Sequence, residues 1–130
     1  MKAIEYAKEI ICEAESLHRD YMTKKAAADQ YAAMPWWKRM ITTRPEMPRM
    51  SHFRSVTIKS SYDECVEVRV YYTGYCREVS IAINEGGQGY KVDARTGEKA
   101  PLIGSRGENI SSVNVDYIAA IRRELAEVLN

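Results

Sequence analysis

The sequence has little of what disulfide frameworks and metal sites require. Its three cysteines, Cys12, Cys65 and Cys76, are an odd number without paired spacing, so neither disulfides nor a structural zinc site is expected. Free thiols are typical of a reducing compartment, which favours a cytoplasmic protein. Only two histidines occur, His18 and His52, and we expect His18 to be solvated on a helix face. No cofactor and no metal are expected.

Long apolar runs are also missing. No apolar stretch approaches the roughly 20 residues that a membrane-spanning helix needs. The first ten residues, MKAIEYAKEI, alternate charged and apolar side chains and lack the apolar centre of a signal peptide. We therefore expect neither a membrane span nor a secretory leader.

The composition is that of one folded domain. The chain has 130 residues, 45% of them hydrophobic and 28% charged, a balance that predicts a single domain over 1–130. The net charge of +1 hides an uneven distribution. Residues 38–59 contain six basic side chains and one acidic one, whereas 1–37 and 60–130 have net charges of −1 and −3. Positive charge is thus concentrated directly after the only two tryptophans.

A helix is predicted over 1–34. Apolar residues recur there at spacings of three and four, at Ile4, Ala7, Ile11, Ala14 and Leu17. A proline at position 35 ends the pattern, because the residue before a proline is pushed out of helical geometry. One continuous helix, or two with a break near residue 23, would both fit.

Residues 35–52 are predicted to be an irregular connector. Three prolines interrupt any regular element, at Pro35, Pro45 and Pro48. The segment also contains two tryptophans, three methionines and several basic residues, whereas most linkers are rich in glycine, serine or proline with polar neighbours.

An antiparallel sheet is predicted over 53–94, where the hydrophobic period changes to two. The apolar face belongs to three strands and a shorter fourth: Val56, Ile58; Val66, Val68, Val70, Tyr72; Val79, Ile81, Ile83; Tyr90, Val92. A two-residue turn at Thr73–Gly74 would place Val68 opposite Val79 and Val66 opposite Ile81. Residues 95–112 are expected to be loop. A final helix is predicted over 113–130, with Asn114 as its N-cap.

These elements predict an α+β fold. It has a long N-terminal helix, a three- to four-stranded antiparallel meander and a C-terminal helix. The valine and isoleucine face of the sheet needs cover, so both helices should pack on that one face. The opposite face would then be solvated or used for contact, and it contains Cys65, Glu67, Arg69, Tyr71, Glu78 and Ser80.

The basic aromatic connector is the best candidate for a working surface. Trp, Met and Arg are enriched where proteins bind proteins, and basic residues among aromatics also suit single-stranded nucleic acid. A structural alternative is that one or both tryptophans fill the gap between the first helix and the sheet. Tyr71, Tyr72 and Tyr75 cluster at one hairpin and are a weaker candidate. The predicted partner-binding residues are Trp36, Trp37, Lys38, Arg39, Arg44, Arg49, Arg54, Tyr71 and Tyr75.

The leading hypothesis is a small non-enzymatic macromolecule-binding protein with a protein partner. Phages and mobile elements encode many such proteins, and an anti-CRISPR-like inhibitor of a bacterial defence nuclease is the specific form we consider. The first alternative is a nucleic-acid-binding module that uses the same connector. The second is a small enzyme in which His52 serves Cys65 or Cys76 as a base. The oligomeric state is left open.

Overall fold

The computed structural model describes residues 2–46, 50–74, 76–104 and 112–129, without the side chains of 112 and 113. Its elements are α1 (Lys2–Ala33), α2 (Trp36–Ile41), β1 (Ser51–Ser60), β2 (Glu64–Thr73), β3 (Arg77–Glu85), β4 (Gln88–Asp93), β5 (Lys99–Pro101) and α3 (Ser112–Leu129). The strands form one antiparallel sheet in the order β1-β2-β3-β4-β5. The predicted α+β class is confirmed.

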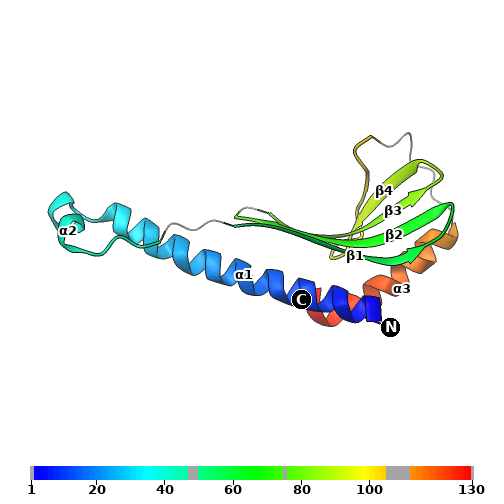
Figure 1. Ribbon diagram of the computed structural model, residues 1–130, viewed down its shortest axis with the longest axis horizontal. Coiled ribbons are helices and arrows are strands. Elements are labelled where there is room, and N and C mark those ends of the chain that lie inside the picture. The colour runs from blue at the N-terminus through cyan, green and yellow to red at the C-terminus, as the bar shows by residue number, and fades with distance from the viewer. Residues whose placement is uncertain (1, 47–49, 75, 105–111, 130) are drawn as a thin grey trace.

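Both helices lie on one face of a curved sheet, as predicted (Figure 1). The core consists of the alternate strand residues that point toward α1 and α3. Val66, Val68, Val79 and Ile81 are fully buried there, against Ile11 and Ala14 of α1 and Ile121 and Leu125 of α3. The predicted core face is therefore correct.

The sheet has five strands, whereas three or four were predicted. The additional strand is β5, in a segment that was expected to be loop, and it pairs Val92 with Lys99 and Tyr90 with Pro101. An aspartate turn brings it back beside β4, because the Asp93 carboxylate accepts hydrogen bonds from the amides of Arg95 and Thr96 at 2.8 and 2.9 Å. β5 has only three residues and ends in proline, so there is no alternating pattern in the sequence from which to predict it. Its place at the edge of the sheet is one that tolerates proline.

The predicted register of the β2–β3 hairpin is wrong by two residues. Val68 pairs with Ile81 and Val66 with Ile83. The turn begins after Thr73, whose amide donates to the Cys76 carbonyl at 2.8 Å and whose hydroxyl accepts from the Cys76 amide at 3.0 Å. A shift by two residues leaves every side chain on its face, so the core prediction was unaffected.

α1 is one continuous helix of 32 residues. A polar cluster fastens it to the sheet: Glu15 accepts hydrogen bonds from the Tyr72 hydroxyl at 2.9 Å, from Arg77 at 3.1 Å and from Arg95 at 2.7 Å. His18 is half-buried beside the Tyr72 ring, 6.4 Å between centroids, and does not sit on a solvated face as expected. The packing between α1 and the sheet accounts for this difference.

The predicted N-cap of the last helix is also wrong. α3 begins at Ser112, two residues earlier than Asn114. Asn114 is buried, and its side-chain amide donates to Glu85 at 2.7 Å. Its role is thus to join α3 to the end of β3.

Candidate functional site

The last 12 of the 32 residues of α1 leave the sheet and, with the chain that follows them, form an arm, which we define as residues 22–46. At about 1.5 Å per residue α1 is about 48 Å long, whereas the ten-residue strands β1 and β2 span about 33 Å. The helix therefore extends past the sheet, and α2 lies at its far end (Figure 1). No residue of the arm, all of which is described, is buried.

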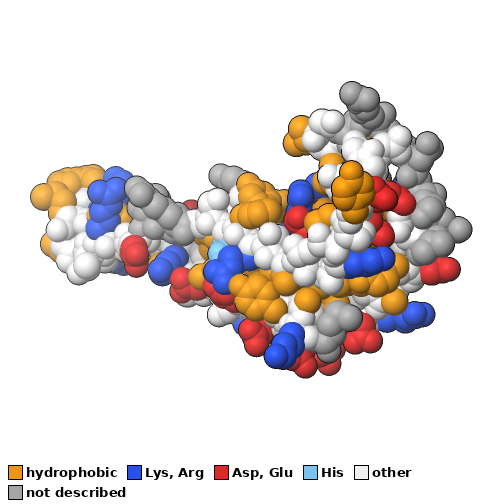
Figure 2. Space-filling view, turned by 45° about the vertical axis from the view of Figure 1, so that its right-hand side comes forward, with side chains coloured by type: hydrophobic (Ala, Val, Ile, Leu, Met, Phe, Trp, Pro, Cys, Tyr) orange, Lys and Arg blue, Asp and Glu red, His pale blue; other side chains and the backbone are white. Residues whose placement is uncertain are grey.

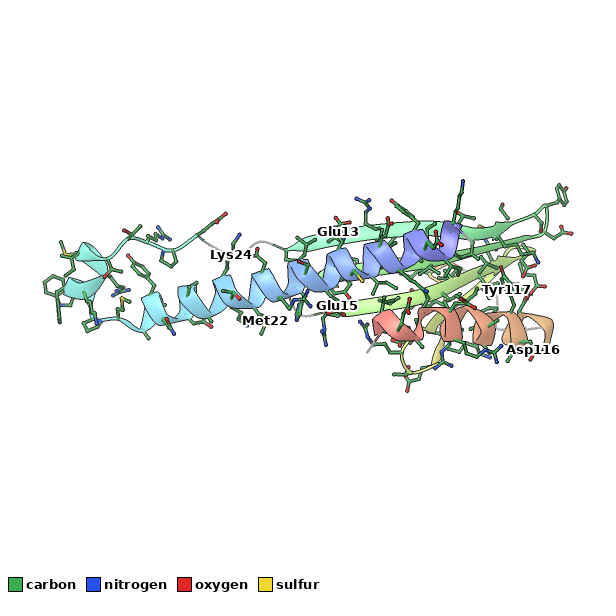
Figure 3. The ribbon with its side chains drawn as sticks, turned by 90° about the horizontal axis from the view of Figure 1, so that it is seen from below. Glu13, Glu15, Met22, Lys24, Asp116 and Tyr117 are labelled. Atoms are coloured by element: carbon green, nitrogen blue, oxygen red, sulfur yellow. The ribbon has the colours of Figure 1, made fainter. Side chains whose placement is uncertain are left out.

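Polar contacts hold the returning chain against α1. Lys24 forms ion pairs with Asp20 on its own helix at 3.2 Å and with Glu46 on the returning segment at 3.5 Å. The hydrogen bond to Asp20 raises the pKa of Lys24, which thus stays charged. Figure 3 shows Lys24 on the side of α1 that faces this segment, with Met22 on the opposite side. The contacts that the structure describes at the root of the arm are therefore polar and solvent-exposed.

α2 is a short helix in the segment 35–52, all of which was expected to be irregular, and β1 also begins inside this segment, at Ser51. Pro35 both ends α1 and starts α2, since its carbonyl accepts hydrogen bonds from the Lys38 and Arg39 amides at 3.0 Å each. Tyr31 fixes the angle between the helices, because its hydroxyl donates to the Arg39 carbonyl at 3.1 Å. The fixed φ of proline suits a helix start, so a short helix can begin where a long one stops.

Both tryptophans are exposed, so the suggestion that they fill a gap between helix and sheet is wrong. The exposed fractions of Trp36 and Trp37 are 68% and 55%, and those of Met40 and Ile41 are 77% and 79%. Figure 2 shows apolar and basic side chains together at this narrow end of the molecule. We call this surface the tip and define it as Trp36, Trp37, Lys38, Arg39, Met40, Ile41 and Arg44.

The tip has uncompensated positive charge. The arm contains five basic and two acidic side chains, a net charge of +3. One of its two acids, Glu46, is already paired with Lys24. Within the described part of the chain, Lys38, Arg39 and Arg44 form no ion pair, whereas Arg69, Arg77 and Arg95 in the sheet region all do.

The other predicted site residues do not join the tip. Arg54 lies on β1, where its guanidinium donates to the Tyr6 hydroxyl near the start of α1 at 3.0 Å. Tyr71 lies on the outer face of the sheet with its ring 6.4 Å from that of Phe53, while Tyr72 faces the core. Arg49 and Tyr75 fall outside the described residues. Sequence reasoning missed Ile41, although its place in a short helix after Pro35 was a usable signal.

A hollow lies on the outer face of the sheet, away from the tip. It has a volume of about 680 Å³ and extends from Phe53 and Tyr71 across to Leu102 and Ile103. Its charged groups are already neutralised, because Lys91 pairs with Glu78 at 2.7 Å and Arg69 with Glu67 at 3.2 Å. The described residues that line this groove include apolar rims but, unlike the tip, no unpaired charge that would select a partner.

Of the residues considered for catalysis, His52 and Cys65 lie apart. His52 pairs with Tyr72 at one end of the β1–β2 ladder, and Cys65 pairs with Ser60 at the other. Cys76 is hydrogen-bonded to Thr73 in the β2–β3 turn and so lies at the same end of the sheet as His52. Burial raises the pKa of the Cys65 thiol, whereas nucleophilic cysteines have a lowered pKa. No group of three metal-ligating side chains occurs among the described residues.

None of the described helices is long and apolar enough to cross a membrane. Comparison with known proteins found no match to any family model, curated protein or solved structure.

Proposed function

We propose that this chain is a non-enzymatic binding protein that docks its tip onto an acidic surface of a protein partner. The observation that carries this proposal is the exposure of two tryptophans beside two guanidiniums, of Arg39 and Arg44, that form no ion pair with any described residue. Exposed Trp and Arg are the residue types that contribute most to protein interfaces. An acidic surface would neutralise the net charge of +3 on the arm.

The aliphatic residues of the tip favour a protein partner over a nucleic acid. Met40 and Ile41 are more exposed than either tryptophan. Aromatic rings and guanidiniums can stack on bases, whereas aliphatic side chains gain most from packing against an apolar protein surface. A partner with apolar side chains inside an acidic rim would bury all four apolar residues.

Charge reversal at the tip tests the proposal. The double variant Arg39→Glu/Arg44→Glu should lose roughly 30-fold or more in affinity, because the loss of even one hot-spot residue costs about 2 kcal/mol or more. The wild-type chain captures partners from an extract of its native host, and affinities for the purified partner are measured by titration. The matched control is Arg19→Glu/Arg123→Glu, the same charge change at exposed positions on α1 and α3. Equal losses in both variants, or no loss in either, would contradict the proposal.

Direct binding to single-stranded nucleic acid is the second candidate. It is supported by the two exposed tryptophans next to exposed Lys38 and Arg39, since bases stack on indole rings and basic groups contact phosphates. Phosphate contacts would make the affinity fall steeply with salt. Titration with single- and double-stranded DNA and RNA at two salt concentrations removes this candidate if no binding is seen.

Inhibition of a bacterial defence nuclease is a specific form of the main proposal. A nuclease presents acidic residues around its metal site and basic residues in its nucleic-acid channel, and the tip would suit the former. Should the captured partner be a nuclease, an equimolar amount of the wild-type chain should stop cleavage. The Arg39→Glu/Arg44→Glu variant should leave cleavage unchanged.

A further inference from the structure

A hollow of about 640 Å³ lies at the tip, between α1, α2 and the returning chain. Apolar groups form much of its lining, with Ala28 and Ala32 from α1, and Trp36 and Met40 from α2. The small side chains of the two alanines leave room for an inserted group. The volume lies within the range of roughly 300–1,000 Å³ that is usual for ligand sites.

Charged groups also line this hollow. Arg39 comes from α2, Arg44 from the returning chain, and Asp29 from α1. Over the described residues none of these three forms an ion pair. Two cations against one anion leave the lining with a surplus of one positive charge, and Glu46 cannot offset it because Lys24 holds its carboxylate.

The hollow is built around a fixed angle between the helices. The Tyr31 hydroxyl bonds to the Arg39 carbonyl at 3.1 Å, so the backbone of α2 is held while the Arg39 guanidinium remains available. Preorganised sites bind flexible ligands with a smaller entropic cost. An apolar floor below two guanidiniums suits a ligand that combines one bulky apolar side chain with carboxylates.

We propose that the hollow binds a peptide segment of the partner in which a bulky apolar side chain is flanked by aspartate or glutamate. The apolar side chain lies over Ala28 and Ala32, and the carboxylates bond to Arg39 and Arg44. Bidentate pairs between guanidinium and carboxylate supply direction as well as affinity. This inference rests on the proposed function and names the feature of the partner that the tip would recognise.

Three labelled peptides provide the probe. The first has one phenylalanine between pairs of aspartates, the second has serine in place of phenylalanine, and the third has lysine in place of the aspartates. In fluorescence anisotropy the affinity for the first peptide should be at least about tenfold higher than for the other two. A tenfold difference in affinity needs only about 1.4 kcal/mol of binding free energy. If all three bind alike, or none binds, the inference is overturned.

Filling the hollow gives an independent test. Ala32→Phe places a ring in the space and should weaken the first peptide about tenfold or more, while circular dichroism stays unchanged. The matched control is Ala27→Phe, also on α1 and exposed but outside the lining, which should change affinity less than about twofold. Equal effects of the two variants would overturn the inference.

The two proposals fail in different ways. A partner protein whose binding depends on Arg39 and Arg44 but not on Ala32 would leave the proposed function standing and remove the peptide hollow. Loss of dependence on the arginines as well would remove both.

Discussion

Replacing Ile81 by alanine is expected to lower the free energy of unfolding by about 2–5 kcal/mol. Ile81 is fully buried on the central strand β3, between Val68 on β2 and Val92 on β4. Removing its methyl groups leaves a cavity that neighbouring strands cannot close. Because a domain of this size is stable by only about 5–15 kcal/mol, this loss is large. Urea unfolding followed by circular dichroism measures it.

The matched control is the same substitution at the tip. Ile41 is 79% exposed, so Ile41→Ala should change the free energy of unfolding by less than about 0.5 kcal/mol. The two variants make the same chemical change, one in the core and one in the arm, so any difference in stability comes from the position. Similar losses at both positions would mean that the tip is packed against the rest of the chain.

The second large effect is expected from Glu15→Ala, which should lower the free energy of unfolding by about 2–3 kcal/mol. Glu15 accepts hydrogen bonds from Tyr72, Arg77 and Arg95, and its removal leaves two guanidiniums close together without their shared anion. Burial raises the pKa of the Tyr72 phenol, so this group stays a neutral donor that also loses its acceptor. Thermal and urea unfolding both report the loss.

A second glutamate on α1 serves as a control, because its replacement by alanine changes the helix in the same way without touching the polar cluster. Glu9 lies on the same helix and is exposed, so Glu9→Ala should leave the free energy of unfolding nearly unchanged. If Glu15→Ala were as mild as Glu9→Ala, the cluster would not be what fastens α1 to the sheet.

The core could be predicted from the sequence because its signal is local. Alternation in β2 and β3 places Val66, Val68 and Val79 on one face whatever their partners are. The register depends on where the turn lies, which alternation alone does not give, because a shift by two residues keeps every side chain on its face. The turn is closed by bonds between Thr73 and Cys76, and a Cβ on the neighbouring Gly74 would meet the hydroxyl of Tyr21 on α1.

The composition of the site could be predicted, but its extent could not. The run from Trp36 to Arg39, with Arg44, was singled out because basic residues follow directly after the only two tryptophans. Arg54 carries the same charge, yet β1 runs back along α1 and takes it to Tyr6. A count of charges along the chain cannot detect this reversal.

Exposure of the tryptophans also required the structure. Their position depends on the difference in length between α1 and the strands, because a helix that matched the sheet would have brought Trp36 and Trp37 onto the core. The difference in length between α1 and the strands cannot be read from residue type or spacing until the bounds of the strands are known.

Tryptophan emission tests the central claim most directly, since the only two tryptophans of the chain both lie at the tip. In the native protein the emission maximum should lie close to that of the urea-unfolded chain, and acrylamide should quench both states to a similar degree. Addition of the captured partner should shift the emission to the blue. A native spectrum that is already blue-shifted and moves to the red on unfolding would contradict the claim, because it would place the tryptophans in the core.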